Sequence, residues 1–257
     1  MKILAIGDVT SPRAVDYLSG KLWEFRRKFG IDFTVVNAEN AAFVTGASPE
    51  LADALIKGGA DCLTGGNHTL RNRSVYTYLD DTREMLRPIN FGDEAPGSGA
   101  CILEANGYRI LVINAMGTVH IDPTLDSPYG YIDKVLRREE GKYDFSILDF
   151  HAEATGEKVA LGYAYDGQIN IIFGTHTHVA TADEQILPLG TGYITDVGMC
   201  GESGGVLGMD KDVTVEKMRT RLPIRFSPAK GEVSCDGVIF TLDTATGRVT
   251  DIKRVKI

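Results

Sequence analysis

Short apolar runs alternate with longer amphipathic segments through the first part of the chain. Apolar runs with the length of buried strands occupy residues 2–6, 32–36 and 61–64. Residues 13–29 repeat apolar side chains at helical spacing, and Ser48-Pro49 begins a second helical segment that extends to residue 57. This alternation predicts an α/β fold whose parallel strands are joined by right-handed crossovers.

The rest of the chain continues the alternation. Asn106-Gly107 between two apolar runs predicts a hairpin. Further helices are expected over residues 72–84, shortly before residue 138, and over 154–164. Other expected strands cover residues 100–104, 108–114, 144–149, 169–173, 182–187 and 192–196, with a last hairpin formed by 233–242 and 249–257. The glycine-rich stretch 198–208 lacks a P-loop pattern, and no linker divides the chain, so we expect a single domain over residues 1–257.

Polar side chains of the kind that binds metals stand just past the first three runs. They are Asp8, then Glu39 and Asn40, then Asn67 and His68. The carboxyl ends of parallel strands lie at one edge of a sheet, where α/β proteins commonly place their chemistry. These groups are therefore predicted to converge.

Three histidines follow two later runs: His151, His176 and His178. Gly174 lets the chain turn tightly, so both imidazoles of the His-x-His pair can face one point. Imidazole is the commonest metal-binding side chain. With the groups at the earlier strand ends, the set offers enough ligands for two metal ions, and its chemistry favours iron, manganese or zinc over calcium or magnesium.

Ordinary structural roles compete with metal binding at several of these positions. Asp8 could cap the helix that follows it, Glu39 could be a surface carboxylate, and the His-x-His pair could lie exposed on a loop. His120 matches no motif and is interpreted as an ordinary loop histidine.

The composition limits the classes of partner. A net charge of −8 argues against a broad nucleic-acid or anionic-membrane surface, and no apolar run approaches a membrane span. No signal peptide is expected at the N-terminus. Cys62, Cys101, Cys200 and Cys235 are far apart, which predicts four reduced thiols in a cytoplasmic protein.

Four motifs give the chain a family resemblance. Asp8 after a strand, Glu39-Asn40, Gly66-Asn67-His68 and the run from Gly174 to His178 resemble the calcineurin-like metallophosphoesterases. The longer blocks 149–155, 193–199 and 208–211 are similar to the bacterial YmdB subfamily, and the likeness extends over nearly the whole chain. The resemblance implies a β-sandwich flanked by helices, in four αββα layers, and members that form homo-oligomers.

The resemblance also implies roles for individual residues. One metal would be held by Asp8, Glu39, Asn40 and His178, and a second by Glu39, Asn67, His151 and His176. His68 would be the catalytic acid. The ions would be iron or manganese, with zinc as the alternative. The implied reaction is hydrolysis of phosphodiesters such as 2′,3′-cyclic AMP through attack by a metal-bound hydroxide. Two alternatives are a phosphomonoesterase or phosphoprotein phosphatase on the same metals, and a nucleotide-binding regulator without turnover.

The chain departs from the family pattern in two loops. Residues 11–15 lack the usual glycine, and Cys200 replaces a threonine at the start of the loop 200–205. Thr10 stands where the wider superfamily has a metal-binding histidine, and Asn40 is the expected substitute ligand. The changes in residues 11–15 and in the loop 200–205 are both expected to lie near the substrate.

Overall fold

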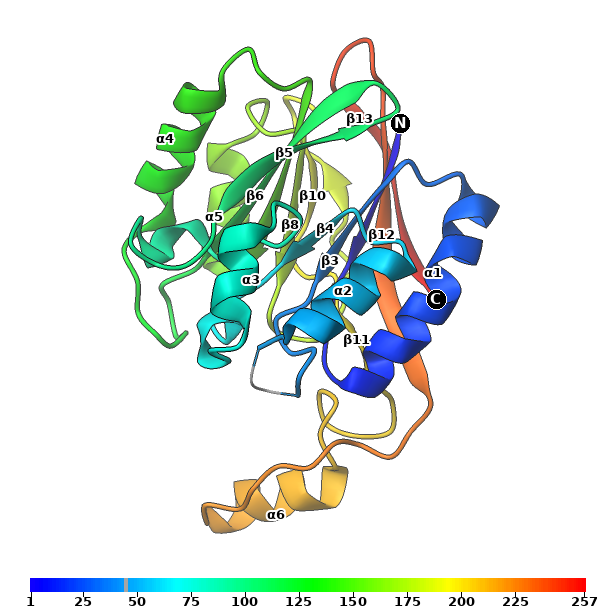
Figure 1. Ribbon diagram of the computed structural model, residues 1–257, viewed down its shortest axis with the longest axis vertical. Coiled ribbons are helices and arrows are strands. Elements are labelled where there is room, and N and C mark those ends of the chain that lie inside the picture. The colour runs from blue at the N-terminus through cyan, green and yellow to red at the C-terminus, as the bar shows by residue number, and fades with distance from the viewer. Residues whose placement is uncertain (44–45) are drawn as a thin grey trace.

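The chain folds into two β-sheets that lie face to face between two layers of helices. The structure is a computed structural model that describes residues 1–43 and 46–257. Helices α1 (Pro12–Phe29) and α2 (Pro49–Gly58) cover one sheet, while α4 (Pro128–Glu139) and α5 (Thr155–Ala164) cover the other (Figure 1). This arrangement confirms the expected four-layer αββα fold.

The first sheet has the strand order β2-β11-β12-β1-β3-β4, with β13 beside β12. The strands β1 (Lys2–Ile6), β3 (Phe33–Asn37) and β4 (Cys62–Thr64) pair in parallel, as predicted. The remaining strands are β2 (Asp8–Val9), β11 (Met199–Glu202), β12 (Val233–Leu242) and β13 (Val249–Lys256). The last two form the predicted hairpin, whereas β11 lies in the stretch for which no strand was predicted.

The second sheet has the order β5-β6-β7-β8-β10-β9. Its strands are β5 (Ala100–Ala105), β6 (Tyr108–Met116), β7 (Phe145–His151), β8 (Ile171–Thr175), β9 (Gln185–Ile186) and β10 (Gly192–Ile194). β5 and β6 form the hairpin predicted around Asn106-Gly107, and β6, β7, β8 and β10 are parallel. The parallel strands of each sheet therefore end together at one edge of that sheet.

Alternating side chains in the strands build separate apolar cores between the layers. In β1, Ile3 joins the core between the two sheets, while its neighbour Leu4 packs under α1 and α2. In β7, Ile147 belongs to the same central core and Leu148 faces the layer of α4 and α5. A one-residue slip in either strand would exchange these faces, so the alternation sets the register of the sandwich.

Two helices differ from the prediction. The helix expected over 72–84 is shorter, α3 (Val75–Asp81), and a 3₁₀ turn, Thr69–Arg71, precedes it. Asn72 separates them, because its Oδ1 accepts hydrogen bonds from the backbone and hydroxyl of Ser74. A second 3₁₀ turn covers Ile89–Phe91. Helix α6 (Lys211–Thr220) was not predicted; it lies on an arm that projects from the body (Figure 1).

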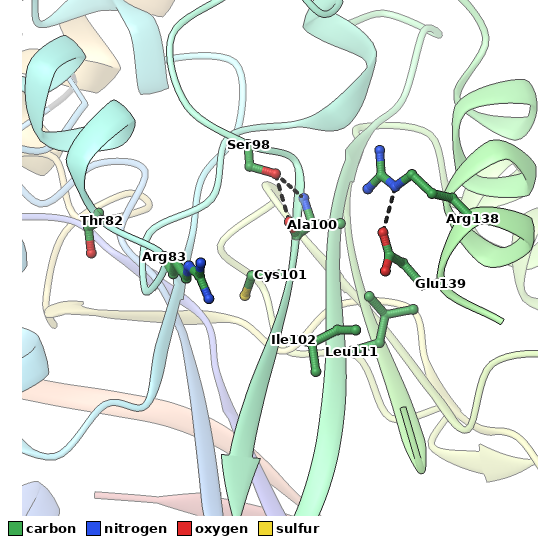
Figure 2. Close-up of a pocket in the computed structure, with 9 residues that line it drawn as sticks. All are labelled: Thr82, Arg83, Ser98, Ala100, Cys101, Ile102, Leu111, Arg138 and Glu139. Atoms are coloured by element: carbon green, nitrogen blue, oxygen red, sulfur yellow. Dashed lines mark hydrogen bonds and ion pairs between the residues drawn. The ribbon is translucent and has the colours of Figure 1, made fainter. Parts of the chain in front are cut away.

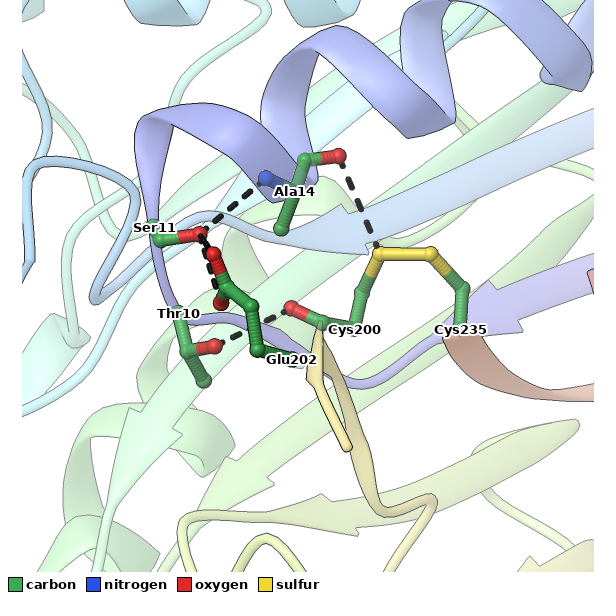
Figure 3. Close-up of a disulfide and its surroundings, with 6 residues drawn as sticks. All are labelled: Thr10, Ser11, Ala14, Cys200, Glu202 and Cys235. Atoms are coloured by element: carbon green, nitrogen blue, oxygen red, sulfur yellow. Dashed lines mark hydrogen bonds between the residues drawn. A yellow bond between two sulfur atoms is a disulfide. The ribbon is translucent and has the colours of Figure 1, made fainter. Parts of the chain in front are cut away.

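The expectation of four reduced thiols is wrong for two of the cysteines. Cys200 and Cys235 form a disulfide, while Cys62 and Cys101 are free (Figure 3). The two partners are 35 residues apart, and they come together because β11 and β12 pair antiparallel with Cys200 opposite Cys235. A disulfide is uncommon in reducing compartments, so the cysteines no longer support a cytoplasmic location.

The two loops that depart from the family pattern contact each other (Figure 3). Ser11 Oγ donates to the Glu202 carboxylate at 2.9 Å and also caps α1 by accepting from the Ala14 amide. Thr10 Oγ1 donates to the Cys200 carbonyl at 3.3 Å. All four of these loop residues are buried, and Ser11 connects the loop 200–205 to the start of α1. Of the described helices, none has the length and apolar character needed to cross a membrane.

Candidate active site

The eight predicted site residues gather at the edge where the parallel strands of both sheets end. Each has an atom within 3.4 Å of another member: Asp8, Glu39, Asn40, Asn67, His68, His151, His176 and His178. Asp8 lies in β2, and Ser11 caps α1 instead, which removes the capping role considered for Asp8. His120 is an exposed residue of the loop that follows Met116 at the end of β6.

The centre of the cluster is formed by Glu39, His151 and His176. His176 Nδ1 lies 3.0 Å from His151 Nε2, and Glu39 Oε1 lies 3.3 Å from the same nitrogen. Donor atoms of these three residues all lie within 4.8 Å of one another. Gly66 makes this approach possible, because a Cβ there would come within 2.3 Å of Glu39 Oε2 and of the His151 ring.

A polar partner on the other side of each histidine ring indicates which nitrogen faces the cluster. His151 Nδ1 lies 2.9 Å from Thr175 Oγ1, and that hydroxyl donates to Asp149 Oδ1 at 2.7 Å. The Thr175 hydroxyl uses its proton in this bond, so it can only accept a hydrogen bond from His151. Nδ1 of His151 therefore carries the ring proton, and Nε2 is left bare, that is, unprotonated. His176 Nε2 lies 3.2 Å from a Glu153 oxygen, which leaves Nδ1 bare.

His178 follows the same rule. Its Nδ1 lies 3.2 Å from the Leu207 carbonyl oxygen, which can only accept a hydrogen bond. In the neutral ring Nε2 is therefore bare, and it lies 3.7 Å from Asp8 Oδ1. Asn67 donates through Nδ2 to the Asp122 carbonyl, so its Oδ1 points toward His151. Each of four side chains therefore directs a lone pair into the cluster: His151, His176, His178 and Asn67.

The cluster has the properties of a cation site. Asp8 Oδ1 and Glu39 Oε1 are buried, and neither has a hydrogen-bond partner among residues 1–43 and 46–257. Burial raises the pKa of both carboxyl groups, whereas it lowers the pKa of His151 to about 4 and that of His176 to about 3. The imidazoles are therefore neutral, and their contacts with Asp8 and Glu39 are not ion pairs. Bare nitrogens and unpaired carboxylate oxygens in contact repel one another unless a cation lies between them, so the donor set fits metal binding.

His68 and Asn40 lie at the open side of the cluster. His68 Nδ1 is 2.7 Å from Asn40 Oδ1 and 3.2 Å from Glu39 Oε1, and the His68 amide donates to Glu39 Oε2. Asn40 thus turns its oxygen to His68 and its Nδ2 toward His178, at 3.4 Å. Burial lowers the pKa of His68, although the nearby Glu39 opposes this shift. With Nδ1 engaged, Nε2 is the His68 nitrogen left for a substrate.

The turn that carries the His-x-His pair differs from the prediction. Gly174 lies inside β8, and it is needed there because a Cβ would come within 1.8 Å of the Thr195 carbonyl oxygen. The turn is made by the histidines themselves, with φ of 103° at His176 and 62° at His178. Left-handed backbone at residues other than glycine is strained and must be held by its surroundings.

A buried ion pair holds this turn. Lys158 Nζ donates to Asp196 Oδ2 at 2.7 Å and to the Thr175 carbonyl at 2.8 Å. Asp196 Oδ2 also accepts from the Thr177 amide at 3.1 Å. Both charged side chains are buried. The pair therefore holds the backbone immediately before His176 and between the two histidines.

Sequence reasoning missed the residues that orient the predicted ligands. Glu153, Thr175, Asp149 and the Lys158–Asp196 pair were not singled out. Glu153 and Asp149 stand two residues from His151, and Thr175 precedes His176, so proximity in sequence was the one available signal. The carbonyl of Leu207 lies 29 residues from His178, and nothing in the sequence indicates that contact.

A cavity of about 360 Å³ opens beside the cluster, and its walls include Glu39, Asn40, His68, His176 and His178. A second cavity of about 420 Å³ lies beside the edge strand β5 (Figure 2). Two of its polar side chains are already paired: Arg138 with Glu139, and Ser98 with the Ala100 backbone. It contains none of the predicted site residues, so we assign the site to the first cavity.

Comparisons with known proteins agree with this geometry. Residues 4–255 match the model of a family described as YmdB-like protein. The chain is 40% identical over its full length to the 2′,3′-cyclic-nucleotide 2′-phosphodiesterase of Bacillus subtilis, covering 97% of that protein. It superposes with a TM-score of 0.92 on a phosphatase from Mycoplasma pneumoniae, at 31% identity, covering all of this chain and 93% of that one. A hypothetical protein from Thermus thermophilus gives the same TM-score at 33% identity, with 100% and 99% covered. The chain therefore belongs to the YmdB-like family and has the calcineurin-like metallophosphoesterase fold.

Proposed function

We propose that the chain is a metal-dependent phosphodiesterase that hydrolyses 2′,3′-cyclic nucleotides. The observation that carries the proposal is the cluster of neutral imidazoles facing the unpaired oxygens of Asp8 and Glu39. The name of the B. subtilis relative supports both the hydrolase class and the cyclic-nucleotide substrate.

Two metal ions, iron or manganese, would share the donor set. Asp8, Glu39, Asn40 and His178 would hold one ion, and Glu39, Asn67, His151 and His176 the other. Asn40 would have to turn its oxygen from His68 toward the metal to serve as a ligand. Such a pair of ions supplies an activated water and positive charge that offsets the phosphate. That local charge lets a chain of net charge −8 bind an anion.

The proposed reaction opens the cyclic phosphate. The P–O2′ bond breaks, the oxygen of a water molecule joins phosphorus, and a proton ends on O2′, leaving a nucleoside 3′-phosphate. His68 would deliver that proton from Nε2, since Nδ1 is held by Asn40 Oδ1. The lowered pKa of His68 means that the bound phosphate must stabilise its protonated form for this role.

Metal analysis of the purified protein, followed by hydrolysis assays, tests the proposal. We expect turnover of 2′,3′-cyclic AMP and of bis-p-nitrophenyl phosphate that is lost on metal removal. Preferential turnover of p-nitrophenyl phosphate would instead support the phosphomonoesterase alternative. Tight binding of cyclic nucleotide by the metal-loaded protein without product would support the regulatory one.

A further inference from the structure

The cavity beside the cluster has one wall that the phosphate chemistry does not use. This wall comes from the arm, which we define as residues 206–228, including α6. Its apolar members that line the cavity are Val206, Leu207, Met209, Met218 and Phe226. The opposite wall carries the predicted metal donors and His68. A ligand in this cavity therefore meets a polar site on one side and an apolar surface on the other.

Hydrogen bonds connect the arm to the wall that carries the predicted metal donors. The Leu207 carbonyl accepts from His178 Nδ1, which links the start of the arm to a predicted metal ligand. The base of the arm is closed by backbone hydrogen bonds from Asp210 to Ser227 and from Ala229 to Gly208. Asp210 Oδ1 then caps α6 by accepting from the amides of Asp212 and Val213. Hydrogen bonds thus connect the apolar wall to His178 through the base of the arm.

Several apolar side chains of this wall are exposed to solvent, whereas a folded chain usually buries large apolar side chains. Met218 is 60% exposed and Leu207 43%, and Phe226 is half-buried with the Lys217 ammonium 3.9 Å from its ring centroid. Exposed apolar surface beside a polar site is typical of ligand recognition. Methionine and phenylalanine both pack favourably on flat aromatic rings.

We propose that the arm is the nucleobase-binding wall of the active site, with Met218 and Phe226 contacting the base of a nucleotide whose phosphate lies at the metal donors. The proposal rests on the proposed function, because it extends the substrate from the cyclic phosphate to the base attached to it. Apolar packing does not read base edges, so the wall would accept purines and pyrimidines alike.

Calorimetric binding to the metal-loaded full chain tests the proposal without relying on turnover. The probes are 3′-AMP, ribose 3-phosphate and inorganic phosphate. Wild type should bind 3′-AMP more tightly than the two probes without a base, and Phe226→Ala and Met218→Ala should each weaken 3′-AMP binding about five- to a hundredfold. Binding of the other two probes should change less than about twofold. Val215→Ala is the matched control, because Val215 is exposed on α6 but does not line this cavity.

Three results would overturn the proposal. The first is wild type that binds 3′-AMP no more tightly than phosphate, and the second is an equal loss for all three probes in the variants. The third is a weakened 3′-AMP affinity that accompanies dissociation of an oligomer on size exclusion, because the wall would then be a subunit contact. Failure of the proposed function has a different signature: base-dependent binding with no hydrolysis of 2′,3′-cyclic AMP.

Discussion

His68 is the residue whose proposed role is most easily separated from metal binding. It lines the cavity, its side chain is 17% exposed, and its Nδ1 contacts Asn40 and Glu39 without being required as a ligand. We predict that His68→Ala lowers kcat by about 10²–10⁴-fold, the usual contribution of general acid–base catalysis. Metal content, measured by plasma mass spectrometry, should stay at the wild-type level. Loss of metal in this variant would contradict the assignment.

Thr175 is a second single residue with a specific expected effect. Its hydroxyl lies between His151 Nδ1 and Asp149 Oδ1, so it orients a predicted metal ligand and is not itself among the predicted ligands. Thr175→Val keeps the shape but leaves His151 free to adopt the other tautomer. We predict that metal affinity falls about 10–100-fold, as for other outer partners of ligating histidines.

The matched control for Thr175→Val is Thr34→Val. Thr34 is also a buried strand threonine, but its hydroxyl has no hydrogen-bond partner in the part of the chain that the structure describes. Metal titration should therefore give the wild-type affinity for this variant. Equal affinities for both variants would show that the Thr175 hydroxyl does not orient His151.

At the scale of the element, the turn after β8 depends on the buried Lys158–Asp196 pair. Removing one partner leaves the other charge buried and uncompensated, which typically costs about 3–5 kcal/mol. We predict a loss of this size in the free energy of unfolding of metal-free Lys158→Met, measured by denaturant titration. Adding Asp196→Asn should restore part of it. A loss below about 1 kcal/mol would mean that the pair does not hold the turn.

The parts of the fold that could be predicted are those encoded within single elements. The runs before Asp8, Glu39 and Asn67 indicated parallel strands, and parallel strands place their ends at one edge, so the site followed from the order of elements. The family resemblance added the four layers and the division of ligands. Helix α6 escaped prediction because Thr214 is its one buried residue and no apolar stripe marks it.

Contacts between distant segments could not be predicted in the same way. The Cys200–Cys235 disulfide depends on which strands pair across the first sheet, and the Leu207 carbonyl reaches His178 only through the path of the arm. The His-x-His turn shows the same limit. Gly174 was expected to make it, yet the positive φ angles fall on His176 and His178, where Lys158 and Asp196 hold the backbone.

At the scale of the whole molecule, metal binding and folding should be coupled. Folding buries Asp8 and Glu39 with raised pKa values, so the metal-free state carries a desolvation cost that a cation offsets. With free metal at about 100 times its Kd, we predict that the metal stabilises the fold by about 2.7 kcal/mol. The measurement is Tm with and without a chelator. Glu39→Gln should show a clearly smaller chelator effect, and an equal effect would place the stabilising ion elsewhere.

The most direct test of the account is an anomalous-scattering crystal structure of the manganese- or iron-loaded protein. The account predicts two metal peaks per chain, both in contact with Glu39, one beside Asp8 and His178 and the other beside Asn67, His151 and His176. A map with no peak at this edge of the sheets, or with metal bound only elsewhere on the chain, would contradict it.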